Sequence, residues 1–454
     1  MDTTLILPEW LIISPLQPPE HRFGVCVQDG RILKVAANDE LRREYPEAEI
    51  VRADGGVCAP GFVDTHTHLY GVLAHGIPLP NAPSGFWSFL NDFWWPMVEN
   101  RLTQEMIGAA TAVQTARMIQ SGITAFYDCT EAPNALPGVL QRQAEVVRKS
   151  GLRAILSFEA TQRISPQNGE QGLRENLHFI QACADEELVR GMMCLHTTFT
   201  CSEDFIRRAF ELAEQTGTLT HLHLSEGSFE PAYCLEHFGM RPVELYDRLG
   251  VLSNRMLASQ CVQLSEQEIE RTALRNVRIS HMPLSNCEVG GGIAPVPDYL
   301  AAGLNVGLGS DGYITDFFEV MRGAFLIHKA ARQNPQVMPA WQVWYMATEG
   351  GARLLDFEQV GRLSPGFRAD LQLIQPVLPT PLTRDNLYEQ ILLYAHASDV
   401  RAVMVNGRWL MREGSLLHLD YHDALQQAHR AAVQLWNVDN SYLLPRSDGR
   451  EQTL

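Results

Sequence analysis

The chain has 454 residues, of which 45% are hydrophobic and 20% charged, and this composition is typical of a globular protein with a large core rather than a disordered or fibrous one. Lys and Arg number 36 against 53 Asp and Glu, which gives a net charge of −17 and argues against nucleic-acid or anionic-membrane partners, because phosphate binding needs a basic patch. The first residues lack a basic segment, no run approaches the roughly 18 apolar residues of a membrane span, and nine cysteines form no CxxC pair, so we expect no signal peptide, reduced thiols and a cytoplasmic protein.

Residues 1–58 contain short strand-like runs with the hairpin-turn dipeptide Asp29-Gly30. From about residue 60, apolar runs alternate with helical stretches, which is the pattern of βα units and a parallel sheet. Eight such runs lie at 61–68, 123–128, 152–159, 189–196, 219–226, 255–264, 277–283 and 304–311. Eight strands with helices between them predict an α/β fold, a (β/α)₈ TIM barrel over 59–361.

The last part of the chain returns to the pattern of the first. Residues 362–411 again contain strand-like runs, with a turn at Asn406-Gly407. Chain ends are often close in space, so we expect 1–58 and 362–411 to form a small β-sandwich domain. Residues 412–454 would be a C-terminal helix, near 422–440, and a frayed tail.

Polar and ionisable residues gather at the carboxyl ends of the predicted strands, the edge where barrel enzymes build their active sites. In chain order they are His66, His68, His196, His223, Glu226, Gln260, His281 and Asp311. Because residues two apart in a strand point the same way, His66 and His68 can both face the barrel mouth.

A histidine pair of this spacing is weak evidence for a metal site by itself, because such pairs also arise by chance. The chain has a second one, His221/His223. Combined with His223 and Asp311, however, the pair supplies three nitrogens and one oxygen, which suits zinc or iron with an open position. The chain's lysines, Lys34, Lys149 and Lys329, avoid the strand ends, so no carbamylated lysine can bridge two metals. We expect one divalent ion, zinc with iron as the alternative.

Two further residues have competing interpretations. His221 faces the same side as His223 and is expected to pack behind it rather than bind the metal. Trp87 lies in an aromatic run, Phe86 to Trp95. It either belongs to a helical core or walls the substrate pocket from a long first loop.

With these residues in place, the chain resembles the amidohydrolase superfamily, and within it the chlorohydrolase and cytosine/nucleoside deaminase branch (ATZ/TRZ-like), with SsnA-like aminohydrolases closest. The resemblance covers nearly the whole chain. Its motifs include APGFVDTHTHL (59–69), FWWPMVENRLTQE (93–105), HLHLSE (221–226), SHMPLSN (280–286), GLGSDG (307–312) and GRLSPGFRADLQLI (361–374).

The resemblance implies metal ligation by His66, His68, His223 and Asp311. It also implies that Glu226 shuttles a proton to the substrate, and that His281 and His196 lie at the substrate. One position departs from the family pattern. Where the strand-six motif usually has a histidine that positions the attacking water, this chain has Gln260, which can orient a water or a substrate but cannot titrate.

The sequence therefore predicts a metal-dependent aminohydrolase that deaminates a nitrogen heterocycle of purine, pyrimidine, pterin or triazine type with a metal-activated water. Two alternatives remain open. One is hydrolysis of a cyclic amide C–N or a C–Cl bond, and the other is a metal-binding pseudoenzyme, suggested by Gln260. We expect a small heterocyclic substrate and a homodimer.

Overall fold

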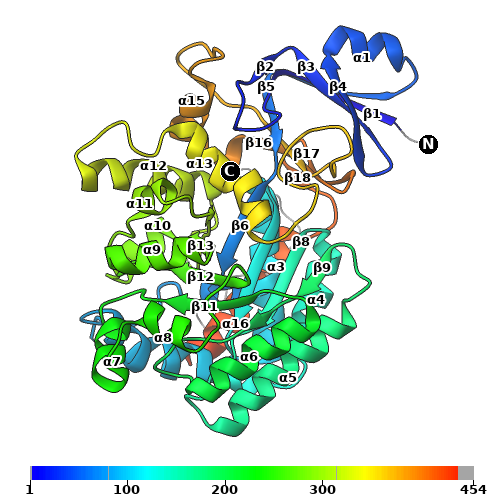
Figure 1. Ribbon diagram of the computed structural model, residues 1–454. Helices are drawn as coiled ribbons and strands as arrows, with labels where there is room; N and C mark the ends of the chain where they lie inside the picture. Colours follow the sequence, from blue (N-terminus) through cyan, green and yellow to red (C-terminus); the bar gives the residue numbers. More distant parts are fainter. Residues whose placement is uncertain (1–2, 80, 313, 438–454) are drawn as a thin grey trace.

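The computed structural model describes residues 3–79, 81–312 and 314–437. It is an α/β protein in which parallel strands flanked by helices occupy one part and a large, mostly antiparallel sheet the other (Figure 1). Within the described residues, every helix is too short or too polar to cross a membrane. All nine cysteines are free, as expected for reduced thiols.

Each of the eight predicted runs contains a strand, and the fourth contains two. The strands form a four-stranded and a five-stranded parallel sheet. The first consists of β6 (Phe62–Thr67), β7 (Ile123–Thr130), β8 (Arg153–Phe158) and β9 (Val189–Gly191). The second consists of β10 (Met193–Cys194), β11 (Thr220–Leu224), β12 (Met256–Gln260), β13 (Arg278–His281) and β14 (Val306–Leu308).

The two sheets approach each other at both ends. Only Met192 separates β9 from β10, and a parallel bridge joins Ala160 to Leu195. At the other end a parallel bridge joins Thr67 to Asp311, and the N–H of Asp311 donates to the carbonyl of His66 over 3.0 Å. The carboxyl ends of the first and the last parallel strand are therefore held together.

The connecting helices have the capping residues that the sequence offers. The Thr103 side chain accepts from the Met106 N–H at the start of α3 (Gln104–Gln120). Ser202 accepts from the Phe205 N–H at the start of α6 (Glu203–Thr216), which ends at Gly217 with φ of +71°. These satisfy backbone groups that a helix end leaves unpaired.

The other helices of the parallel-strand region are α2 (Phe86–Ser88), α4 (Val139–Ser150), α5 (Pro166–Ala182), α7 (Phe229–Phe238), α8 (Pro242–Arg248), α9 (Glu266–Leu274), α10 (Pro283–Glu288), α11 (Val296–Ala301), α12 (Phe317–Arg332), α13 (Ala340–Ala347) and α14 (Glu349–Leu354). A π-helix, η2 (Phe89–Val98), follows α2. Short 3₁₀ turns are η1 (Leu69–Ala74), η3 (Glu99–Arg101), η4 (Pro133–Ala135) and η5 (Ala397–Asp399). Outside this region lie α1 (Asn38–Glu44), α15 (Leu387–Tyr394) and α16 (Tyr421–Trp436).

Both flanks of the chain contribute to one nine-stranded sheet, seen at the upper right of Figure 1. Its strands are β1 (Thr3–Leu11), β2 (Glu20–His21), β3 (Phe23–Gln28), β4 (Arg31–Ala37), β5 (Glu49–Pro60), β15 (Leu371–Ile374), β16 (Val400–Val405), β17 (Arg408–Arg412) and β18 (Ser415–Leu416). Antiparallel pairing of β5 with β15 joins the two flanks. The predicted C-terminal helix is α16, and the expected frayed tail lies outside the described residues.

The two predicted hairpin turns meet each other. Asp29-Gly30 and Asn406-Gly407 both have positive φ at each residue, as a two-residue hairpin turn requires. A Cβ on Gly407 would lie 2.6 Å from the Gly30 Cα. Glycine is therefore required at 407 by close packing as well as by conformation.

A buried ion pair links the large sheet to the parallel strands. The Arg153 guanidinium, from β8, donates to the Asp370 carboxylate through Nε (2.9 Å) and Nη2 (3.3 Å), and both side chains are less than a tenth exposed. The Asn406 N–H also donates to Asp370 Oδ1 over 2.7 Å. This pair is one of the contacts that join the two parts of the fold.

We expect Arg153→Met to lower the free energy of unfolding by about 3–5 kcal/mol, because it leaves the Asp370 charge buried without its partner. Urea denaturation followed by tryptophan fluorescence measures this. Arg52→Met is the matched control, since Arg52 pairs with Asp54 at the surface and exposed pairs contribute little. Equal effects of the two substitutions would contradict the prediction.

Candidate metal centre and active site

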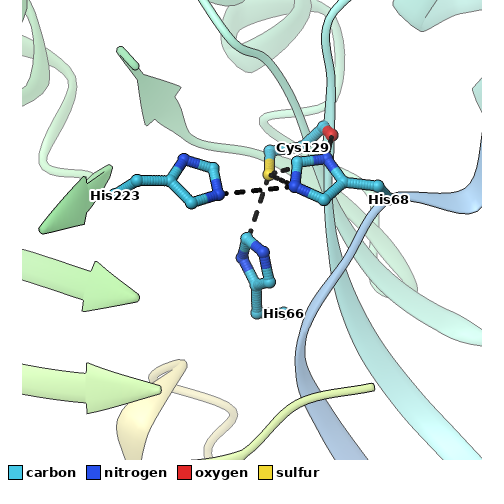
Figure 2. Close-up of side chains that lie close together, drawn as sticks. All are labelled: His66, His68, Cys129 and His223. Atoms are coloured by element: carbon cyan, nitrogen blue, oxygen red, sulfur yellow. Dashed lines mark hydrogen bonds between the residues drawn. The ribbon is translucent and has the colours of Figure 1, made fainter. Parts of the chain in front are cut away.

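His66, His68 and His223 converge at the carboxyl ends of β6 and β11, as Figure 2 shows. The Nε2 atoms of His68 and His223 lie 3.4 Å apart. The Asp311 carboxylate is 4.0 Å from His66 Nε2 and 3.9 Å from His68 Nε2. The structure thus brings together the four residues that the sequence predicts as ligands.

This donor set suits a divalent metal. Imidazole nitrogens bind zinc at about 2.0–2.1 Å, so two of them around one ion lie roughly 3.3 Å apart, close to the separation of His68 and His223. His66 Nε2 is buried and has no hydrogen-bond partner among the described residues. A buried nitrogen without a partner is costly unless something binds it, and an ion at this position would do so.

Cys129, on β7, is a neighbour that sequence analysis does not single out. Its backbone carbonyl lies 2.8 Å from His68 Nδ1. Because a carbonyl can only accept, Nδ1 carries the proton and Nε2 keeps its lone pair for the cluster. The Cys129 Sγ lies 3.9 Å from His68 Nε2, and Figure 2 shows it beside the three histidine rings.

Glu159, just after β8, places a carboxylate beside His223. Its Oε1 lies 3.1 Å from His223 Nδ1 and 3.6 Å from His196 Nε2. Burial alone would lower the pKa of His223, but the Glu159 carboxylate outweighs it and raises that pKa to about 10. Burial likewise opposes ionisation of Glu159, yet the charges of His223 and His196 lower its pKa.

Glu159 was absent from the predicted site, although its position in the sequence could have identified it. It is the last residue of the third predicted run, 152–159, and therefore obeys the same rule of position as the other site residues. It lies among histidines because adjacent parallel strands bring their carboxyl ends to one edge.

Three hydrogen bonds fix the Asp311 side chain. Gln260 Nε2 donates to Oδ2 over 2.7 Å, Ser285 Oγ donates to the same oxygen over 2.9 Å, and the Gly312 N–H donates to Oδ1 over 2.7 Å. Gln260 is thus in direct contact with a predicted ligand. Its own Oε1 is buried without a partner among the described residues.

A small cavity of about 40 Å³ lies beside these residues. Glu226 lines it and is partly buried, and burial, against the opposing charge of His223, raises the Glu226 pKa to about 8. The rest of the wall includes His68, Glu99, Glu159, His196, His223, Gln260, Ser285 and Asp311, together with an aromatic segment, Phe86, Phe89, Leu90, Trp94 and Trp95.

The remaining predicted site residues take different positions. His196 lines the cavity, and its Nδ1 lies 2.9 Å from Thr200 Oγ1. His281 is buried and is not among the residues that line the cavity, and its Nε2 lies 3.0 Å from His328 Nε2. Trp87 is 38% exposed and stacks on Phe229, so the cavity wall is formed by its neighbours in the aromatic run. His221 stacks on His66, in the packing position expected of it.

Residues 57–410 match the model of the amidohydrolase family. The chain belongs to the amidohydrolase family. This amidohydrolase is 32% identical to a 5′-deoxyadenosine deaminase of Methanosarcina mazei over 417 residues, which are 90% of this chain and 93% of that one. It is also 32% identical to a 5-methylthioadenosine/S-adenosylhomocysteine deaminase of Pelotomaculum thermopropionicum over 442 residues, 95% and 99% of the two chains.

Solved structures agree with the fold of this amidohydrolase. An adenosine deaminase from Xanthomonas campestris with bound zinc has a TM-score of 0.86 at 23% identity and covers 96% of this chain and 99% of its own. A zinc complex of an atrazine chlorohydrolase from Arthrobacter aurescens has a TM-score of 0.82 at 18% identity, covering 94% and 100%. The predicted family and the predicted class, a hydrolase acting on carbon–nitrogen bonds, are confirmed.

Replacing Glu159 should expose its effect on His223. In the metal-free protein we expect Glu159→Gln to lower the His223 pKa, because burial then acts without the carboxylate that opposes it. At pH 7 the ring would change from protonated to neutral, which NMR titration of the histidine ring signals detects. Glu186→Gln, which removes a carboxylate bound to Arg148, is the control. An unchanged His223 titration in Glu159→Gln would contradict the assigned contact.

Proposed function

We propose that this amidohydrolase hydrolytically deaminates an adenosine-type purine nucleoside. The observation that carries the proposal is the convergence of His66, His68, His223 and Asp311 beside Glu226 in a buried cavity. Support also comes from relatives at 32% identity that are deaminases of 5′-deoxyadenosine and of 5-methylthioadenosine/S-adenosylhomocysteine. Ammonia release from adenosine derivatives is the direct test.

We further propose that His66, His68, His223 and Asp311 hold one zinc ion. Three imidazole nitrogens and one carboxylate oxygen are a typical donor set for catalytic zinc. When bound, such an ion lowers the pKa of a water molecule so that it is a nucleophile near neutral pH. The carbonyl of Cys129 serves to orient the His68 ring by accepting from its Nδ1, and the carboxylate of Glu159 places a negative charge beside His223.

Glu226 is the proton donor to the substrate in this proposal. Without a metal, burial raises the Glu226 pKa to about 8, so that this carboxyl group is largely protonated at neutral pH. It can therefore donate to a ring nitrogen as the C–NH₂ carbon is attacked, which makes that carbon more electrophilic. Glu226 lines the same cavity as His68, His223 and Asp311, so its carboxyl group lies at the proposed reacting centre.

Asp311 is the acceptor of the proton of the attacking water and passes it to the departing amine. Its Oδ2 already accepts from Gln260 and Ser285, so its orientation is fixed before substrate binds. We assign Gln260 to positioning Asp311 and, through its free Oε1, the water. This function needs hydrogen bonds but no titration, so the glutamine is compatible with catalysis. His196 and His281 remain proposed substrate residues, and Trp87 a proposed residue of the pocket rim.

The proposal extends to architecture and assembly. We propose that the two parallel sheets form a single (β/α)₈ barrel over 59–361, supported by the bridges Ala160–Leu195 and Thr67–Asp311. Segments 1–58 and 362–411 would form a β-sandwich, supported by the meeting of the Gly30 and Gly407 turns, followed by 412–454 as C-terminal helix and tail. Three statements remain predictions: the protein is cytoplasmic, it forms a homodimer, and it is similar to SsnA-like aminohydrolases.

Metal content tests the ligand assignment. We expect one zinc ion per chain by elemental analysis after purification with added zinc, and loss of the ion in His66→Ala/His68→Ala, because two ligands are too few for a catalytic site. His237→Ala is the control, since His237 lies on the exposed surface of α7. Two ions per chain, or none, would contradict the assignment.

Glu226→Gln tests the proton donor. We expect turnover of an adenosine-type substrate to fall about 10²–10⁴-fold while the metal content stays intact, because glutamine keeps the shape but cannot transfer a proton. Steady-state kinetics and elemental analysis on the same preparation measure both. Loss of the ion would instead identify Glu226 as a ligand, and unchanged turnover would remove it from the mechanism.

A further inference from the structure

We propose that the protein has a second ligand site, separate from the strand ends, and that its ligand is a small monocarboxylate with an apolar body. The site is a cavity of about 570 Å³ between η1, α3 and α16, a volume in the range that small ligands occupy. None of its described lining residues lines the cavity beside His223 and Asp311. The proposal therefore concerns a different ligand from the proposed nucleoside and is independent of deamination.

Apolar side chains make up most of the cavity wall and come from all three elements. Leu73 belongs to η1, Val113 to α3, and Leu425, Val433 and Trp436 to α16. The indole Nε1 of Trp436 already donates to the Leu73 carbonyl over 2.7 Å, so this ring offers a ligand its carbon surface rather than a hydrogen bond. Such a wall favours a ligand whose body is apolar, because binding then removes apolar surface from water.

Arg117, from α3, places a guanidinium in this apolar wall. The side chain is half-buried, and its Nε donates to the Tyr421 hydroxyl over 3.4 Å. Among the described residues Arg117 makes no ion pair, and its Nη1 and Nη2 make no hydrogen bond. A guanidinium presents its N–H groups in a fork that matches the two oxygens of a carboxylate. Arg117 therefore supplies a group that can bind the anionic head of a ligand.

The other ionisable groups of the wall leave this charge unopposed. The described lining residues include neither Asp nor Glu, and the remaining titratable side chains among them are those of His75 and His429. Burial lowers the pKa of His75, against the effect of the Gly312 carbonyl 2.9 Å from its Nε2, and the charge of Arg117 lowers it further. One permanent cation in an apolar cavity suits a monoanion, because it repels a cation and leaves part of a dianion without a partner.

The cavity is a neighbour of the proposed active site rather than a part of it. His75 Nε2 contacts the Gly312 carbonyl, and the Gly312 N–H donates to Asp311 Oδ1 over 2.7 Å. A ligand in contact with His75 is thus two hydrogen bonds away from a predicted metal ligand. Because a carboxylate probe can itself bind a zinc ion, the experiment has to locate the probe as well as detect it.

Two probes with the same apolar body test the head group: 4-phenylbutyrate, which is an anion at neutral pH, and 4-phenylbutanamide, which is uncharged. On the zinc-loaded full chain we expect calorimetry to give a Kd lower by about tenfold or more for the acid, the effect of one charge-assisted pair with Arg117. Equal affinities, or tighter binding of the amide, would overturn the proposal. Binding of neither probe would mean that another part of the chain or a second copy fills the cavity, which also overturns it.

Arg117→Gln tests the charge. We expect this variant to bind 4-phenylbutyrate about tenfold more weakly and the amide as the wild type does, because glutamine keeps hydrogen-bonding groups but has no charge. Arg174→Gln, on the exposed surface of α5, makes the same change of net charge and should leave both affinities unchanged. An equal loss in the two variants would show that the charge of the whole protein acts. Undiminished binding of the acid to Arg117→Gln would place it elsewhere, and either result overturns the proposal.

A bromine label locates the probe directly. We expect anomalous scattering from crystals soaked with 4-(4-bromophenyl)butyrate to place the bromine among Val113, Val433 and Trp436. Ala432→Phe tests the location in solution, since Ala432 lines the cavity and a phenyl ring there takes up its space. Both probes should then fail to bind, while thermal denaturation shows that the variant still unfolds cooperatively. Bromine at the metal centre, or binding that survives Ala432→Phe, would overturn the proposal.

Discussion

The site depends on one backbone hydrogen bond, from the N–H of Asp311 to the carbonyl of His66. This bond joins the end of β14 to the end of β6 and so sets the distance between the carboxylate and the two histidines of the first strand. Asp311 has a φ of +62° and Gln260 a φ of +71°, a region that side-chain-bearing residues rarely adopt. The hydrogen bond between their side chains helps to hold both, and strain of this kind is common at functional positions.

The buried histidines differ in charge, and this difference limits the repulsion between them. Burial and the neighbouring rings of His68 and His223 lower the pKa of His66 strongly, so that ring is neutral. The Cys129 carbonyl fixes the proton of His68 on Nδ1 and leaves the lone pair of its Nε2 facing the cluster. His223 is positively charged beside the Glu159 carboxylate and must lose a proton before its Nε2 can bind a metal. Metal binding at this site is therefore coupled to proton release.

The sequence was sufficient to predict the features that follow from the pattern of apolar residues and from the position of polar residues at strand ends. All eight apolar runs contain strands, and His66, His68, His223 and Asp311 converge because strand ends share an edge. Features that arise from packing between distant segments were not predictable in the same way. The Arg153–Asp370 pair joins residues 217 positions apart. The hydrogen bond from Gln260 to Asp311 depends on two unusual backbone conformations. The sequence shows that Gln260 replaces the usual histidine, but only the structure shows that Gln260 contacts Asp311.

The aromatic segment over the site has a consequence for how ligands enter. Phe89 begins η2, a π-helix that contains Pro96, and such helices are rare and often functional. The cavity beneath it has room for water but is far smaller than the roughly 300 Å³ that ligand pockets usually provide. The aromatic side chains that line this cavity, among them Phe89 and Trp94, therefore limit the space that an entering ligand has. Substitutions in η2 that never contact a substrate can thus change the space beside the site, and with it how tightly a ligand binds.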